Sequence, residues 1–131
     1  MKSRPKVGAV GELALTVEPH HAIDFATGGM PAVLSTPNLI GLLERTAREA
    51  VAPWLDENER TVGIEIELKH LAPTPVGAKV RCTARVVRVD GKEIGFQIQA
   101  SDAQEVIARG AHTRRVIRVE GFSRRVAEKK A

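Results

Sequence analysis

Thr36, Glu44 and His70 are the residues of this sequence best suited to proton transfer and nucleophilic attack. Thr36 stands at the start of a predicted helix, where the helix dipole favours developing negative charge. Glu44 lies on the margin of that helix's apolar stripe, where partial removal from water would suit its carboxyl group to acid or base chemistry. His70 ends an apolar strand face, and an imidazole exchanges protons near neutral pH. If the three side chains converge, they provide a hydroxyl, a base and an acid for attack on a carbonyl group.

Each of these residues also has a purely structural interpretation. The Thr36 hydroxyl could cap the helix by accepting a backbone N–H. Glu44 could pair with Arg48 four residues later. His70 could be a histidine at the edge of the core, bonded to a backbone carbonyl. The pattern leaves both interpretations open for all three residues.

One helix must position two of the three residues. Thr36-Pro37 is typical of a helix start, because proline lacks only an N–H that has no partner there. At about 100° per residue, one stripe roughly 120° wide collects apolar side chains. Its members are Leu39, Ile40, Leu43, Ala47, Ala50, Val51 and Trp54. The stripe predicts the buried face, and Pro53 ends the helix.

Strand-like alternation occurs before the helix at residues 7–17 and after it in four segments. In residues 61–70 the alternation predicts one apolar face. That face consists of Val62, Ile64, Ile66, Leu68 and His70. In residues 79–89 a change of parity at Val87 suggests a bulge, and Asp90-Gly91 predicts a hairpin into the strand that contains Phe96. The last strand covers residues 105–119.

This order of elements predicts an α+β fold in which a five-stranded antiparallel sheet wraps a central helix. We expect the four strands after the helix to form a meander. Residues 1–131 form a single predicted domain with loose ends at 1–6 and 123–131, and residues 19–31 form an irregular loop.

Composition excludes several classes of protein. A net charge of +4 and 3% aromatic residues argue against nucleic acid as a partner, because base-stacking rings are scarce. Cys82 is the only cysteine, so no internal disulfide can form and a reducing, cytoplasmic setting fits best. The sequence contains no run of eighteen apolar residues, so we expect no membrane span.

His20 and His21 are adjacent and lack the spacing of a metal site, and His112 has the parity of a structural strand residue, so we expect no metal and no cofactor.

Several short segments together resemble the hotdog-fold acyl-CoA thioesterases, and in particular the branch that includes fluoroacetyl-CoA thioesterase. The resemblance covers residues 7–120. It rests on Ser35-Thr-Pro-Asn-Leu-Ile-Gly-Leu-Leu-Glu44, Ala52-Pro-Trp-Leu55, Val62-Gly63, Lys69-His70, Ala72-Pro-Thr-Pro-Val-Gly77 and Gly110-Ala-His-Thr-Arg114.

The resemblance implies roles for individual residues. It implies a catalytic set of Thr36, Glu44 and His70, with Gly63, His70 and Arg114 at the substrate. It also implies a homodimer whose sheets join edge to edge, with the active site at the subunit interface. The sequence departs from the fluoroacetyl branch before the helix, where Thr27 and Met30 stand at roughly the positions of the aromatic residues that close over the acyl group.

Two functions follow from these observations. The first is an acyl-CoA thioesterase that hydrolyses a small acyl-CoA to the free acid and CoA. The modest positive charge of the chain is compatible with binding the phosphates of CoA. The second is a hotdog module without catalysis that binds an acyl-CoA or a protein partner.

Overall fold

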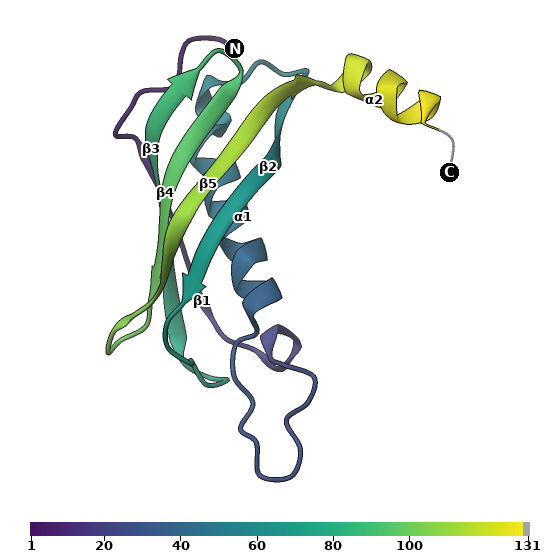
Figure 1. Cartoon of the computed structure of the whole chain (residues 1–131). Coiled ribbons are helices and arrows are strands. Elements are labelled where there is room, and N and C mark those ends of the chain that lie inside the picture. The colour runs from purple at the N-terminus through teal and green to yellow at the C-terminus, as the bar shows by residue number, and fades with distance from the viewer. Residues whose placement is uncertain (130–131) are drawn as a thin grey trace.

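One long helix lies along one face of a curved, five-stranded antiparallel sheet (Figure 1). The structure is a computed structural model and describes residues 1–129. In chain order the strands and helices are β1 (Val10–Thr16), α1 (Thr36–Val51), β2 (Glu59–His70), β3 (Lys79–Asp90), β4 (Glu93–Ser101), β5 (Val106–Arg118) and α2 (Val119–Glu128). Short 3₁₀ turns cover Pro19–His21 and Ala52–Trp54. The predicted hotdog arrangement of a helix and a five-stranded sheet is confirmed.

The sheet order is β1-β3-β4-β5-β2, so the predicted four-strand meander is wrong in one respect. Only β3, β4 and β5 follow one another, and β2 pairs with β5 at the edge of the sheet. The physical reason lies in residues 71–78. Pro73 and Pro75 cannot donate to a strand ladder, so this segment crosses to the far side of the sheet instead of turning back as a tight hairpin.

The core between α1 and the sheet is aliphatic apart from one ring. The buried face of α1 agrees with the predicted stripe and consists of Leu39, Leu43, Thr46, Ala47 and Val51. The single buried aromatic ring of this core is Phe96 on β4. Helix and sheet lie in close contact at Gly11, where an added Cβ would lie 2.6 Å from the Cβ of Ala50. These contacts fix the height of α1 over the sheet, and with it the place of every side chain that α1 carries.

Bulges interrupt three strands, one of them β5, where the register with β4 shifts between Ala100 and Ser101. The predicted bulge in β3 is confirmed, since the register shifts between Val86 and Arg88. A second bulge lies in β2 between Gly63 and Glu65. It overturns the single face predicted for residues 61–70, because Thr61 is buried on one side of the bulge while Ile64 at the bulge is 45% exposed. The inward face resumes after the bulge and ends at His70.

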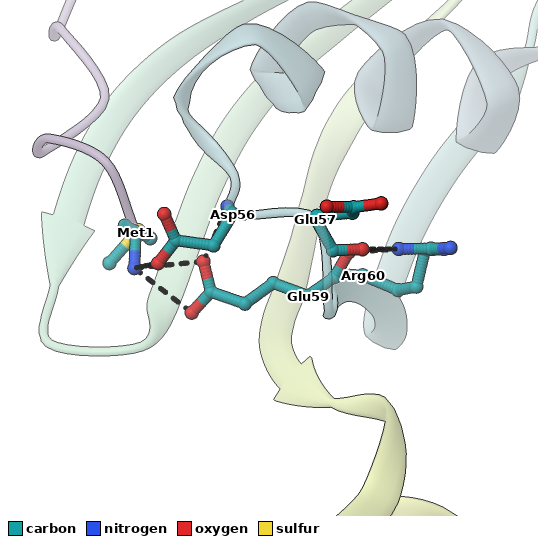
Figure 2. A network of polar contacts seen from close by, with 5 residues as sticks. All are labelled: Met1, Asp56, Glu57, Glu59 and Arg60. Atoms are coloured by element: carbon teal, nitrogen blue, oxygen red, sulfur yellow. Dashed lines mark hydrogen bonds and ion pairs between the residues drawn. The ribbon is translucent and has the colours of Figure 1, made fainter.

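The first residues are tied to the domain where the sequence predicts a loose end. The Met1 ammonium lies 2.8 Å from a carboxylate oxygen of Glu59 and 3.1 Å from one of Asp56 (Figure 2). Arg4 donates to the carbonyl of Val89. Glu59 is buried, and its hydrogen bonds to the ammonium and to the Asp56 backbone lower its pKa.

The last residues also differ from the prediction. Residues 119–128 form α2, which leaves the end of β5 on the side of β2 and extends away from the sheet (Figure 1). The predicted loose end at 123–131 is therefore helical as far as residue 128, while residues 130 and 131 lie outside the described part of the chain. Within residues 1–129, no helix is long and apolar enough to cross a membrane.

Candidate active site

Thr36 and His70 lie in direct contact at one end of the sheet. Thr36 Oγ1 and His70 Nδ1 are 2.8 Å apart. Ser35 caps α1, because its side chain accepts the backbone N–H of Asn38. The alternative in which the Thr36 hydroxyl caps the helix is therefore wrong. Thr36 occupies the first helical position, and its hydroxyl faces the imidazole.

His70 combines partial burial with one unsatisfied nitrogen. Burial lowers the pKa of His70, and a backbone contact with Ala72 opposes this shift. Nε2 is shielded from solvent and has no hydrogen-bond partner among residues 1–129. The ring is therefore neutral at pH 7, and its Nδ1 can accept the proton of the Thr36 hydroxyl.

The pair opens onto two hollows. One, of about 290 Å³, borders both Thr36 and His70, and the other, of about 430 Å³, borders Thr36 and the start of α1. The walls of the smaller hollow are mainly apolar. Phe25 lines both hollows and is 60% exposed. The sequence analysis did not select Phe25. The signal that could have identified it is that Phe25 is a phenylalanine ring in the irregular loop 19–31, which is otherwise poor in aromatic residues.

Glu44 belongs to a second group of residues, centred on Arg114. Arg114 is 5% exposed and donates from Nε and Nη2 to the side chain and the carbonyl of Thr61, at 2.9 and 2.8 Å. Its Nη1 lies 3.5 Å from Glu44 Oε2. Burial lowers the pKa of Arg114 and the Glu44 carboxylate opposes the shift, but a guanidinium stays charged. Glu44 is thus paired with Arg114 in the structure, and its side chain remains 42% exposed.

Gly63 completes this group because no side chain fits at its position. An added Cβ would lie 2.5 Å from Glu44 Oε2 and 3.2 Å from the His112 ring. The strand bulge that follows Gly63 brings the backbone close to the carboxylate. The interpretation of Gly63 as a bulge and its interpretation as a place of close backbone approach are therefore compatible.

His112 is the member of this group that the sequence analysis treated as structural. It is 2% exposed, and Arg114 Nη1 lies 3.1 Å from its Nε2. A guanidinium can only donate, so Nε2 accepts and the ring proton is on Nδ1, which donates to the carbonyl of Glu65 at 2.7 Å. Burial lowers the pKa of His112, and the bond to Glu65 opposes the shift. His112 therefore links the bulge in β2 to the buried guanidinium.

The candidate residues form two groups within one copy of the chain. Thr36 and Glu44 are eight residues apart on α1, about 12 Å along its axis. Gly63 and His70 are seven residues apart on β2, roughly 23 Å. The structure thus joins Thr36 to His70, and Glu44 to Gly63 and Arg114, but it does not join the two groups. Among residues 1–129, no cluster of three His, Cys, Asp or Glu side chains could hold a metal ion.

Comparisons with known proteins give one consistent picture. The family model described as fluoroacetyl-CoA-specific thioesterase matches residues 17–120. A fluoroacetyl-CoA thioesterase of Streptantibioticus cattleyicolor is 32% identical over 137 aligned positions, which cover 98% of this chain and 97% of that protein.

Solved structures agree with the sequence comparison. A crystal structure of a mutant of the fluoroacetyl-CoA-specific thioesterase FlK superposes with a TM-score of 0.90 at 30% identity, covering 98% of this chain and 100% of the other. A hot-dog-like protein from Thermanaerovibrio acidaminovorans superposes with a TM-score of 0.87 at 25% identity, covering 95% and 93%.

Proposed function

The chain belongs to the fluoroacetyl-CoA-specific thioesterase family, and on that premise we propose that it hydrolyses the thioester of a small acyl-CoA with Thr36, Glu44 and His70. The observation that carries the proposal is the 2.8 Å contact between Thr36 Oγ1 and His70 Nδ1 beside an apolar hollow. A hydroxyl held by a neutral imidazole is a common arrangement for attack on an acyl group.

The chemistry needs one proton acceptor and one attacking oxygen. His70 Nδ1 takes the proton as Thr36 Oγ1, or a water that it positions, bonds to the carbonyl carbon. The C–S bond then breaks, and the proton returns from His70 to the sulfur of CoA. If Thr36 itself is acylated, water completes the reaction by the same route and releases the free acid.

Glu44, Gly63 and Arg114 act from the second group of residues. Buried Arg114 holds the Glu44 carboxylate, and Gly63 lets that carboxylate approach the strand backbone, where the family resemblance implies that the thioester binds. Because these residues lie away from Thr36 and His70 within one copy, we propose that the complete site forms between two copies.

A homodimer through β2 would bring the two groups together. β2 is an edge strand whose outer backbone groups have no ladder partner, and such an edge favours pairing with another strand. Antiparallel pairing of two β2 strands about Glu67 would place Lys69 opposite Glu65 of the partner subunit, a favourable cross-strand charge pair. It would also bring His70 close to Gly63 of the partner subunit. The dimer supports one complete site at each end of the shared edge.

The small hollow and its loop bear on the acyl group. A space of about 290 Å³ with apolar walls suits a short acyl chain. Thr27 and Met30 stand where the fluoroacetyl branch has aromatic residues, so we do not expect a preference for fluoroacetyl-CoA over acetyl-CoA. The cytoplasmic setting remains a prediction from the lone cysteine.

A panel of acyl-CoA substrates in a thiol-release assay tests the function. We expect turnover of at least one short acyl-CoA, and the loss of that turnover in a His70→Ala variant that remains a dimer. Equal turnover by the His70→Ala variant would reject the mechanism. Binding of acyl-CoA without thiol release by the unmodified protein would favour the module that only binds.

A further inference from the structure

Helix α2 is amphipathic, and no part of residues 1–129 covers its apolar face. Val119, Phe122 and Val126 follow the three- and four-residue spacing of one helix face. They are 40%, 42% and 57% exposed, and no residue of α2 is buried. The helix begins where the Val119 N–H donates to the carbonyl of Asn58, and it then extends outward on the side of β2 (Figure 1).

A second exposed apolar area surrounds the Thr36–His70 pair. Phe25, Met30 and Leu71 are 60%, 42% and 49% exposed, and all three line the hollow beside His70. Exposed side chains of this size, gathered around a reactive pair, leave the acyl group open to water. Efficient thioester chemistry needs water to be controlled at this point.

The two apolar areas lie at opposite ends of the same edge strand. Glu59, at the first end of β2, pairs with Arg118, which directly precedes α2, while His70 is at the other end. The twelve residues of β2 span about 36 Å, so α2 cannot reach the hollow of its own copy. The two-fold axis at Glu67 of the proposed dimer places the Glu59 end of one copy beyond His70 of the partner subunit, and so carries α2 of one copy toward the hollow of the other.

The charges of the two areas complement one another. Residues 18–34 contain Glu18 and Asp24 and no lysine or arginine. Arg125, and Lys129 at the C-cap, flank the apolar face of α2, while Glu120, Arg124 and Glu128 lie on the opposite face. Attraction between these side chains would favour the same docking that the apolar surfaces favour.

From this geometry we propose that α2 of each subunit covers the acyl pocket of the partner subunit, with Phe122 packing against Phe25, Met30 and Leu71 of that partner. The inference rests on the proposed β2 homodimer. Phe122 then provides, from the second subunit, an aromatic cover that the loop itself lacks at Thr27 and Met30. A second copy of this chain is the occupant because the apolar rim, the opposite charges and the shared edge all point to it.

The kinetics of a surface variant give the first test. Phe122→Ser should lower kcat/KM for short acyl-CoA substrates roughly tenfold, the discrimination that a few apolar contacts in a pocket can provide. Val87→Ser is the matched control, because Val87 is 47% exposed on β3, which β4 and β5 separate from β2. An unchanged kcat/KM in the Phe122→Ser variant would overturn the proposal.

Crosslinking tests the contact itself. Cys82 is buried, and burial raises the pKa of its thiol to about 11, so the unmodified chain should not react with a short bismaleimide. The Phe25→Cys, Phe122→Cys double variant should form a covalent dimer, and each single variant should not. A double variant that sediments as a dimer but is not crosslinked would overturn the α2 contact and leave the proposed dimer standing. A double variant and an unmodified chain that both sediment as monomers would overturn the dimer and the α2 contact together.

Discussion

The two groups of polar residues differ in how completely their hydrogen bonds are satisfied. The Thr36–His70 pair is held by one bond, with Thr36 exposed, Nε2 of the ring unpaired and a loop as its cover. Arg114 instead has a partner for each of its nitrogens and is 5% exposed. One group can exchange protons and admit a substrate, while the other is a rigid charged platform. The His70 end of β2 thus holds polar groups with unsatisfied hydrogen bonds, while the Gly63 end holds groups whose hydrogen bonds are satisfied.

Breaking the reactive group should give the largest change in rate. His70→Asn keeps a polar atom near the Thr36 hydroxyl but cannot accept its proton. We expect kcat to fall by about 10²–10⁴, the usual contribution of a positioned base. Thermal unfolding should show no loss of stability, because the substitution also removes the unpaired Nε2. A His70→Asn enzyme with kcat within tenfold of the unmodified chain would contradict the assignment.

Breaking the platform should instead destabilise the fold. Arg114→Met leaves the Thr61 carbonyl and the half-exposed Glu44 carboxylate without their cationic partner, and we expect a loss of about 1–3 kcal/mol in the free energy of unfolding. Arg115→Met is the matched control on the next residue. Arg115 is 51% exposed and pairs with Glu93 at the surface, so its loss should cost about 1 kcal/mol or less. Urea unfolding measures both variants, and equal losses would mean that Arg114 is not the centre of a buried network.

A subtler change in the platform should affect rate more than stability. Gly63→Ala places a Cβ 2.5 Å from the present position of Glu44 Oε2, so the carboxylate must move. We expect kcat/KM to fall roughly tenfold, because the substitution displaces the carboxylate that we propose acts in the reaction, while its exposed side chain can find another position. Gly41→Ala on the open face of α1 meets no atom within 4 Å and serves as the control, with unchanged rate. A Gly63→Ala enzyme as fast as that control would remove Gly63 and Glu44 from the site.

The two histidines should make both groups sensitive to acid, and this is the smallest effect. Burial lowers the pKa of His70 and of His112 in the folded chain. As the pH falls below the ordinary histidine value of about 6.5, the unfolded chain therefore binds protons first and the free energy of unfolding decreases. The stability is fully present above that value. Urea unfolding between pH 7.5 and 5 should show the decrease, with a smaller decrease in His70→Asn, and a stability that rises in this window would contradict the burial of both rings.

Much of the scaffold could be predicted from local patterns. The apolar stripe of α1, the bulge in β3 and the Asp90-Gly91 hairpin depend on neighbouring residues, and the structure confirms all three. The pairing of β2 with β5 could not be predicted, because alternation shows that a strand has an apolar face but not which strand lies beside it. The helical end of the chain was also missed, since α2 buries none of its side chains and its pattern is short.

The site shows the same division. The sequence pattern selected Thr36 and His70, which the structure brings into contact, and the family resemblance implied Gly63 and Arg114, which the structure places beside Glu44. The sequence could not show that these residues form two separate groups. The distance between the groups depends on where α1 lies along β2, and the spacing of residues in the sequence does not give that position. The sequence also could not identify His112 as a hydrogen-bond partner of the Arg114 side chain. A histidine on an inward strand face shows the same pattern when it only packs against its neighbours.

The most direct test of the central claim is the mixing of two inactive subunits. If His70 of one copy works with Glu44 of the other, then His70→Asn and Glu44→Gln chains refolded together produce mixed dimers with one complete site each. Because half of the dimers are mixed and each has one intact site of two, the mixture should recover roughly a quarter of the unmodified activity. If the mixture remains as inactive as the two variants alone, the site is not shared between subunits and the account is contradicted.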